Sequence, residues 1–279
     1  AYGYRSTRFM VRAEVEGLLS TSRYCAGLYD TAAGHCHPLK YALGIAAATK
    51  VTGVHFYEGS RVTAIECGPT VIVRTANGSV RAKQVALCAN VGLGEIAPAL
   101  GRKSMGVATY IVATRQLGAE RATALIRNNM AVSDANWVLD YFLRSADYRL
   151  LFGGRVSYSG IDPVNTANAT RLRMLRVFPQ LADTEIEYAW GGFVDITMNR
   201  APHFGRLDPN IYFLQGFSGH GMVLTGIAGK IVAEAIAGQA ERFDIYTRIR
   251  HHDFPGGMAL RRPALVLAML WYRMKDLLP

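Results

Sequence analysis

A glycine-rich segment near residue 220 has the residue types best suited to binding a ligand through the main chain. Residues 216–222 read Gly-Phe-Ser-Gly-His-Gly-Met and follow an apolar stretch at 211–214. Glycines at 216, 219 and 221 permit positive φ and allow a ligand to approach the backbone. Apolar residues then recur with a helical period as far as Gly238. We therefore predict a strand, a turn and a helix whose first N–H groups stabilise negative charge on a ligand.

Two familiar phosphate-binding loops do not account for this turn. It lacks the Gly-Lys-Ser/Thr ending of a Walker A loop and the spacing of the dinucleotide fingerprint. A closer match to that fingerprint, Gly-Leu-Gly-Glu-Ile-Ala at 92–97, is followed by Pro98, which would disrupt a helix growing from it. No acidic residue follows at the distance needed to hold a ribose, so we interpret residues 92–97 as a turn.

Two histidines that flank a cysteine, His35 and His37 around Cys36, suggest a metal site. On a strand, side-chain alternation would put both histidines on one face and the cysteine on the other. No third or fourth ligand stands at a metal-like spacing nearby. We therefore predict no metal here.

Length and composition limit the class of protein. The 279 residues suit one large or two modest domains, and 50% hydrophobic with 19% charged residues indicates a globular chain. No apolar run approaches the ~20 residues of a membrane span. The net charge of +10 is spread along the chain, which argues against nucleic-acid binding. Four scattered cysteines without a C-x-x-C pair indicate reduced, buried thiols and a cytoplasmic setting.

Periodicity predicts which elements position the turn. Helices are expected at 12–19, 39–49 and 168–178. Strands are expected at 54–57, 61–65, 71–75 and 84–88, with a hairpin turn at Asn77-Gly78, and again at 107–114, 137–144, 150–158 and 185–189. This order predicts an α/β fold in which two units are interleaved, because the glycine turn must pack back beside the early strands.

Several segments resemble one family. Residues 216–221 resemble the G-[FY]-S-G-H-G segment of the D-amino-acid-oxidase-like FAD-dependent oxidoreductases. Trp190-Gly191-Gly192, and residues 197–205 with Pro202, resemble that family's W-x-G…T-x-[DN]-x-x-P-x-x-G stretch. The segment 34–37, the strand at Asp140-Tyr141 and the tail 254–257 look closest to its gamma-glutamylputrescine oxidoreductase subfamily.

The resemblance implies a partial, Rossmann-like FAD-binding domain at 35–98 and 203–240. This domain would be interleaved with an antiparallel-sheet substrate domain at 1–34 and 99–202. Residues 241–279 would form a C-terminal extension. It implies that the turn meets the pyrimidine edge of FAD and that Val62 meets adenine through its main chain. His220 could bind the cofactor or cap the loop. The residues expected to contact FAD are Val62, Gly216, Ser218, Gly219, His220, Gly221 and Met222.

The same resemblance implies oxidation of an amine. A hydride would pass from a C–H beside the amine to flavin N5, giving an imine and then an aldehyde or keto product. Such a reaction needs aromatic walls more than an acid–base pair. The candidates are Tyr141 and Trp190, which we place at the catalytic site, together with Phe142 and Phe152. Each of these side chains could equally belong to the core.

Two departures from relatives refine the expected chemistry. Amino-acid-oxidizing relatives such as monomeric sarcosine oxidase place a lysine after the turn to bind the substrate carboxylate, whereas Met222, Val223 and Leu224 stand here. Some relatives tether flavin through a cysteine near W-x-G, and residues 191–193 contain none. We therefore expect non-covalent FAD and a small-molecule amine without an α-carboxylate.

One family feature is not found. No G-x-G-x-x-G unit, which holds the FAD pyrophosphate in relatives, occurs in the sequence. We expect the chain by itself to bind FAD weakly. The alternative interpretation is a truncated, non-catalytic binding or scaffold protein that has lost the cofactor. The electron acceptor and the oligomeric state stay open.

Overall fold

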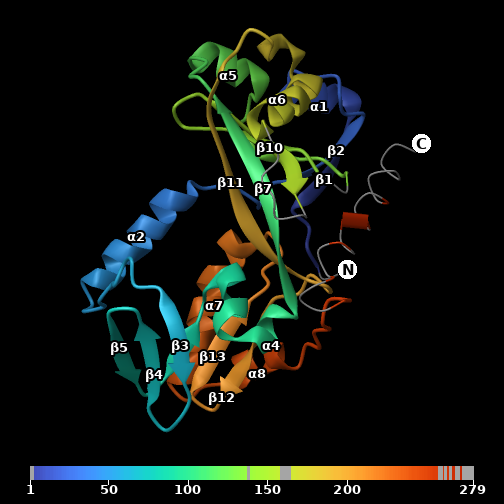
Figure 1. Ribbon diagram of the computed structural model, residues 1–279. Coiled ribbons are helices and arrows are strands. Elements are labelled where there is room, and N and C mark those ends of the chain that lie inside the picture. Colours follow the sequence, from blue (N-terminus) through green and yellow to red (C-terminus); the bar gives the residue numbers. More distant parts are fainter. Residues whose placement is uncertain are drawn as a thin grey trace.

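The computed structural model describes residues 3–136, 139–157 and 165–256, together with residues 260, 263, 266, 267 and 271. Its centre is a five-stranded antiparallel sheet in the order β11-β7-β10-β9-β8 (Figure 1). The strands are β7 (Ser104–Thr114), β8 (Val132–Ser133), β9 (Tyr141–Arg144), β10 (Leu150–Ser157) and β11 (Ile186–Thr197).

Helices and a two-stranded antiparallel sheet cover one end of this sheet. They are β1 (Thr7–Val11), α1 (Arg12–Leu18), β2 (Ala26–Asp30), α5 (Ala119–Leu125), α6 (Thr166–Val177) and the 3-10 turn η2 (Pro179–Leu181). Phe142 stacks on Phe152 at 5.7 Å between ring centroids and meets the edge of Phe178 at 5.1 Å. These rings form the centre of a buried cluster that reaches from Met10 to Leu181. Alternation along the strands therefore buries one face of the sheet under the helices.

The other end of the molecule contains two three-stranded sheets. One is antiparallel, in the order β3 (Val62–Glu66), β4 (Val71–Thr75), β5 (Gly78–Ala82). In the other, β13 (Ile211–Gln215) runs parallel to β6 (Val85–Leu87) and antiparallel to β12 (His203–Asp208). The helical elements around them are α2 (Pro38–Lys50), η1 (Asn90–Gly92), α3 (Leu93–Ile96), α4 (Pro98–Gly101), α7 (Gly221–Ile236) and α8 (Glu241–Thr247).

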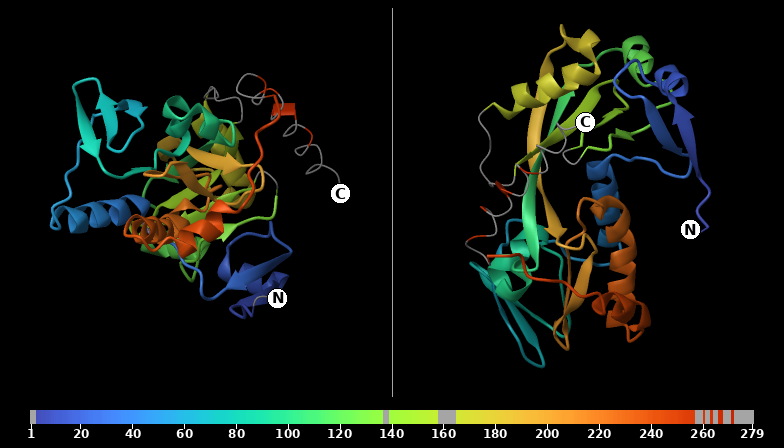
Figure 2. Two further views of the ribbon diagram at one scale, coloured as in Figure 1. Left: turned by 90° about the horizontal axis from the view of Figure 1, so that it is seen from below. Right: turned by 90° about the vertical axis from the view of Figure 1, so that its right-hand side faces the viewer.

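Strands β7 and β11 join the two ends. They pair along nearly their whole length and run from the helix-covered end of the sheet towards α4 and α7 (Figures 1 and 2). Gly191 allows this close pairing, because a Cβ there would stand 2.8 Å from the ring of Tyr110 on β7. The last residues of β11 lie beside the glycine-rich turn, to which Asp195 and Thr197 are hydrogen bonded.

The predicted α/β class with an antiparallel sheet is confirmed, and so are the helices near 12–19, 39–49 and 168–178. Three strand predictions need correction. Residues 54–57 form no strand, because an apolar alternation makes a strand only where a partner lies alongside. The Asn77-Gly78 turn joins β4 to β5, a polar strand that the pattern missed. Strand β11 continues well past residue 189, because pairing with β7 overrides its glycines.

Other predictions need smaller corrections. The segment at 92–97 forms a single helical turn, α3, instead of an open turn. His35, Cys36 and His37 lie outside any strand, so the alternation argument does not apply to them. The four cysteines are unpaired but exposed, not buried. The compartment and the domain boundaries stay predictions, and residues 137, 138 and 158 of the expected strands lie outside the described residues.

In the part of the chain that the structure describes, no single helix is long and apolar enough to cross a membrane. Helices α7 and α8 reach that length and composition only together, and they are bent by 116° relative to each other.

Candidate functional site

The glycine-rich turn begins where β13 ends. Every residue of β13 is buried, so this apolar strand fixes the base of the turn in the core. Gly216, Ser218 and Gly219 all have positive φ, at 71°, 53° and 90°. The prediction of positive φ is therefore confirmed at 216 and 219. It was wrong at Gly221, which has entered helix α7 and whose φ is not positive.

The start of α7 has free hydrogen-bond donors. Within the described residues, the N–H groups of Gly221, Met222 and Val223 have no hydrogen-bond acceptor. His220 stands at the N-cap position, is exposed, and its side chain makes no cap hydrogen bond. These three donors therefore lie at the positive end of a sixteen-residue helix, where an acceptor or an anion is stabilised.

These donors border a cavity of about 520 Å³. It is lined from three directions: by Cys88 after β6, by Phe193 and Asp195 on β11, and by the turn and α7, which contribute Gly219, Gly221 and Met222 among others. Ser218 lines it too, but its hydroxyl donates to the carbonyl of Gly216 at 3.1 Å and accepts from the N–H of Thr197 at 3.4 Å. The Ser218 side chain therefore stabilises the turn from inside.

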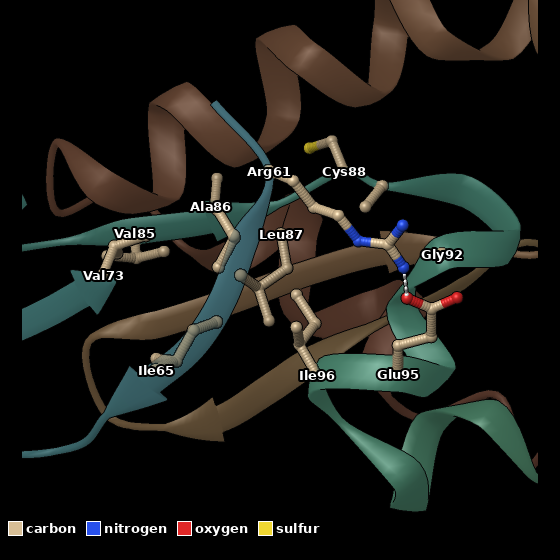
Figure 3. Close-up of a pocket in the computed structure, with 12 residues that line it drawn as sticks. Arg61, Ile65, Val73, Val85, Ala86, Leu87, Cys88, Gly92, Glu95 and Ile96 are labelled. Atoms are coloured by element: carbon tan, nitrogen blue, oxygen red, sulfur yellow. Dashed lines mark hydrogen bonds and ion pairs between the residues drawn. The ribbon is translucent and has the colours of Figure 1, made fainter. Parts of the chain in front are cut away.

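A second cavity, of about 690 Å³, lies between β3, β6 and α3. Val62 lines this cavity. Val85 and Leu87 of β6 line it as well (Figure 3). An ion pair between Arg61 and Glu95 crosses it. The register of β3 against β4 shifts between residues 62 and 64, which disturbs the regular pairing of the main chain at Val62.

Cys88 lines both cavities, so the two regions that the sequence assigned to FAD lie next to each other. Cys88 follows the end of β6 and Gly216 follows the end of the parallel strand β13. Ligands of α/β sheets bind outside the carboxyl ends of parallel strands. The position of both cavities fits that rule and suits an elongated ligand.

The aromatic candidates divide between the two faces of the five-stranded sheet. Cross-strand pairing places Tyr141, Gly153, Ile111 and Trp190 in one row, which puts Tyr141 and Trp190 on the same face, roughly 14 Å apart across three strand spacings. Phe142 and Phe152 form the next row and point into the buried cluster. Of the two alternatives for Phe142 and Phe152, the core is therefore the one that holds, because alternation sends both side chains to the covered face.

Tyr141 and Trp190 differ in their surroundings. The Tyr141 ring fills the space above Gly153, where a Cβ would stand 2.2 Å from the ring. Burial raises the pKa of the Tyr141 phenol, which also hydrogen bonds to the side chain of Thr109. Trp190 is 46% exposed and lies five residues before Asp195 on β11, roughly 16 Å along the strand. By alternation, the Trp190 side chain lies on the opposite face of β11 from Phe193 and Asp195, which line the cavity at the turn, so a contact between the aromatic row and a ligand there stays a prediction.

Other sequence candidates have local partners. The Nε2 atom of His35 lies 2.8 Å from the carbonyl oxygen of Asn129, and His37 caps α2 by accepting from the N–H of Lys40. No group of three metal-binding side chains occurs among the residues that the structure describes.

Comparison with known proteins assigns the family. The model of the family DAO, FAD dependent oxidoreductase, matches residues 1–235. The chain belongs to this family. It is 40% identical over 276 residues to gamma-glutamylputrescine oxidoreductase of Escherichia coli K12, covering 99% of this chain and 65% of that protein. It is 38% identical over 280 residues to a probable oxidoreductase OrdL of Haemophilus influenzae, covering 99% and 64%.

The fold agrees with this assignment. Glycine oxidase from Geobacillus kaustophilus superposes with a TM-score of 0.76 at 17% identity, covering 89% of this chain and 68% of that one. The chain spans slightly less than two thirds of the length of each of the two curated relatives, the gamma-glutamylputrescine oxidoreductase and the OrdL protein. Family membership indicates FAD as the cofactor. The free N–H groups of α7 fit the acceptor edge of a flavin, N1–C2=O.

Two residues of the site were missed from the sequence as contributors. Asp195 accepts a hydrogen bond from the N–H of Gly216, and the methyl group of Thr197 lies against Gly216. A signal for Asp195 was present, because it is a charge between Val194 and Ile196 in a strand that is apolar at that point. A buried carboxylate requires a hydrogen-bond donor, although the sequence does not say which one.

Proposed function

We propose that this chain forms the flavin-edge and substrate side of an FAD-dependent amine oxidoreductase. The observation that carries the proposal is the set of three free N–H groups at the start of α7, which borders a cavity at the carboxyl ends of β6 and β13. When bound, FAD would accept a hydride from the carbon beside the amine.

Each group of residues would have a defined role. The N–H groups of Gly221, Met222 and Val223 would stabilise negative charge at the flavin edge without help from a side chain. Val62 would bind the distal part of a non-covalently held FAD in the second cavity. Tyr141 and Trp190 would form the apolar walls that orient a neutral amine and exclude water.

The substrate proposal rests on Val223. This side chain is 81% exposed in the first turn of α7, where a lysine would bind a carboxylate in amino-acid oxidases of the family. Together with the name of the Escherichia coli relative, Val223 supports an amine without an α-carboxylate, such as gamma-glutamylputrescine.

The donor role can be tested by removing one N–H group. Met222→Pro deletes the N–H at the second position of α7, where proline is tolerated because no intrahelical bond is lost. Met222→Ala deletes the side chain and keeps the N–H, so it is the matched control. In an FAD-loaded protein containing this chain, the proline variant should reduce flavin at least about 10-fold more slowly than the alanine variant. Equal rates with equal melting temperatures would exclude the donor role.

The substrate class needs a separate experiment. Flavin reduction by gamma-glutamylputrescine should be faster than reduction by sarcosine or glycine, measured by stopped-flow absorbance on the same preparation. Faster reduction by the two amino acids would contradict the assignment from Val223. No reduction by any amine would favour a binding or scaffold role instead.

A further inference from the structure

Asp195 is an acidic side chain buried in strand β11. It is 4% exposed and stands between Val194 and Ile196. Taking a carboxylate out of water is costly unless donors satisfy it. Its Oδ2 atom accepts a hydrogen bond of 2.9 Å from the N–H of Gly216, a residue 21 positions later in the chain. The carboxylate therefore links β11 directly to the glycine turn.

Main-chain contacts join the same two segments. The carbonyl oxygen of Asp195 accepts from the N–H of Ser218 at 2.9 Å, and the N–H of Thr197 donates to the Ser218 hydroxyl at 3.4 Å. The Thr197 methyl group occupies the space beside Gly216, where a Cβ would stand only 2.3 Å away. The end of β11 thus holds residues 216 and 218 through both its side chains and its main chain.

The turn depends on such external support. Gly216, Ser218 and Gly219 are all left-handed, and Ser218 has a Cβ that disfavours this conformation. A strained backbone persists when the surrounding structure over-determines it. Helix α7 begins two residues after Gly219, so the path of the turn sets the direction of the first N–H groups of the helix.

We propose that Asp195 is a positioning residue that acts through Gly216. Its carboxylate holds the turn against β11, and this fixes the free N–H groups of α7 at the cavity that Asp195 itself also lines. The inference rests on the proposed function for the identity of the ligand in that cavity. The geometry of the turn does not depend on the ligand.

Hydrogen exchange followed by mass spectrometry tests the turn in the chain without cofactor. Asp195→Asn keeps an acceptor oxygen, whereas Asp195→Ala removes it. We expect the amides of residues 216–218 to exchange at least about 10-fold faster in the alanine variant and within about 3-fold of wild type in the asparagine variant. Peptides from β7 and β10 show whether each variant is folded.

Asp140 supplies a matched control. It is a buried carboxylate in the other part of the molecule and accepts from Nε of Arg173 at 2.6 Å. Asp140→Ala should leave exchange at residues 216–218 unchanged. The proposal is overturned if Asp195→Ala also leaves it unchanged, or if Asp140→Ala increases it equally.

Adding excess FAD separates this inference from the proposed function. FAD should slow exchange at residues 221–223 in wild type and in Asp195→Asn, and much less in Asp195→Ala. Equal protection in the alanine variant and in wild type would overturn the positioning role. Protection in none of the three proteins counts against the proposed function, and the cofactor-free exchange then still decides the role of Asp195.

Discussion

Strand β10 and helix α2 both carry regularly spaced apolar side chains, yet they bury them to opposite extents. Phe152 in β10 is fully buried between Phe142 and the helices at the end of the sheet. Leu43 in the middle of α2 is 60% exposed, and no residue of α2 is buried. A helix of thirteen residues is close to the shortest that is stable in isolation. Apolar periodicity therefore identifies a face suited to burial without identifying what covers it.

The largest expected effect contrasts these two positions. Phe152→Ala should lower the free energy of unfolding by about 3–5 kcal/mol, because it leaves a cavity in a packed cluster. Leu43→Ala should change it by less than about 0.5 kcal/mol, because the side chain is already in solvent. Urea unfolding followed by circular dichroism measures both. A loss at Leu43 as large as that at Phe152 would show that α2 is covered in solution.

The glycines of the turn form a graded series with smaller effects. Gly216→Ala combines positive φ with a collision against Thr197, and should cost about 2–4 kcal/mol. Gly219→Ala has positive φ but open space around it, so about 1 kcal/mol is expected. Gly221→Ala is helical and uncrowded, and should be neutral within about 0.5 kcal/mol. Thermal melts that ranked these three variants differently would contradict the described turn.

His203, which is buried on β12, and the partly buried His251 predict a pH dependence of stability. The ring centroids of His203 and His251 are 4.2 Å apart. The Nδ1 atom of His203 lies 2.9 Å from the side-chain nitrogen of Gln215. Burial, assisted by the charges of His251 and Lys103, lowers the pKa of His203 to about 3, and burial also lowers the pKa of His251.

The sign of the effect follows from proton binding. Between about pH 6.5 and pH 3 the unfolded chain binds more protons at His203 than the folded chain. The contribution of His203 to the free energy of unfolding is therefore fully present above about pH 6.5 and is lost as the pH falls. The loss at pH 5 is at most about 2 kcal/mol, and solvent screening makes it smaller. Urea midpoints at pH 7 and pH 5 measure this loss, which should shrink in His203→Gln. An unchanged slope in that variant would assign the dependence to other groups.

The smallest effect on stability is expected at Trp190, on the open face of the sheet. Trp190→Leu should change the free energy of unfolding by less than about 0.5 kcal/mol, because the indole is half exposed. In an FAD-loaded protein, the same variant should lower the rate of flavin reduction by an amine several-fold. Chemical unfolding and stopped-flow reduction separate the two effects. A large loss of stability without loss of rate would place Trp190 in the core.

The sequence by itself determined the local parts of the site. The apolar run before Gly216, the glycines of the turn and the helical period up to Gly238 predicted β13, the turn and α7. Pro179 predicted the end of α6 in the same way. These predictions succeeded because steric limits, capping and periodicity act over a few neighbouring residues. The strand predicted at 54–57 failed because pairing depends on residues elsewhere in the chain.

Only the tertiary structure decided which distant residues meet. Tyr141 and Trp190 share a face because β10 and β7 lie between their strands, while Phe142, next to Tyr141, is turned into the core. Asp195 meets Gly216 because β11 extends along β7 to the end of β13. Alternation in a sequence separates two faces of a strand, but strand order and register determine which face is covered and which residues lie opposite each other.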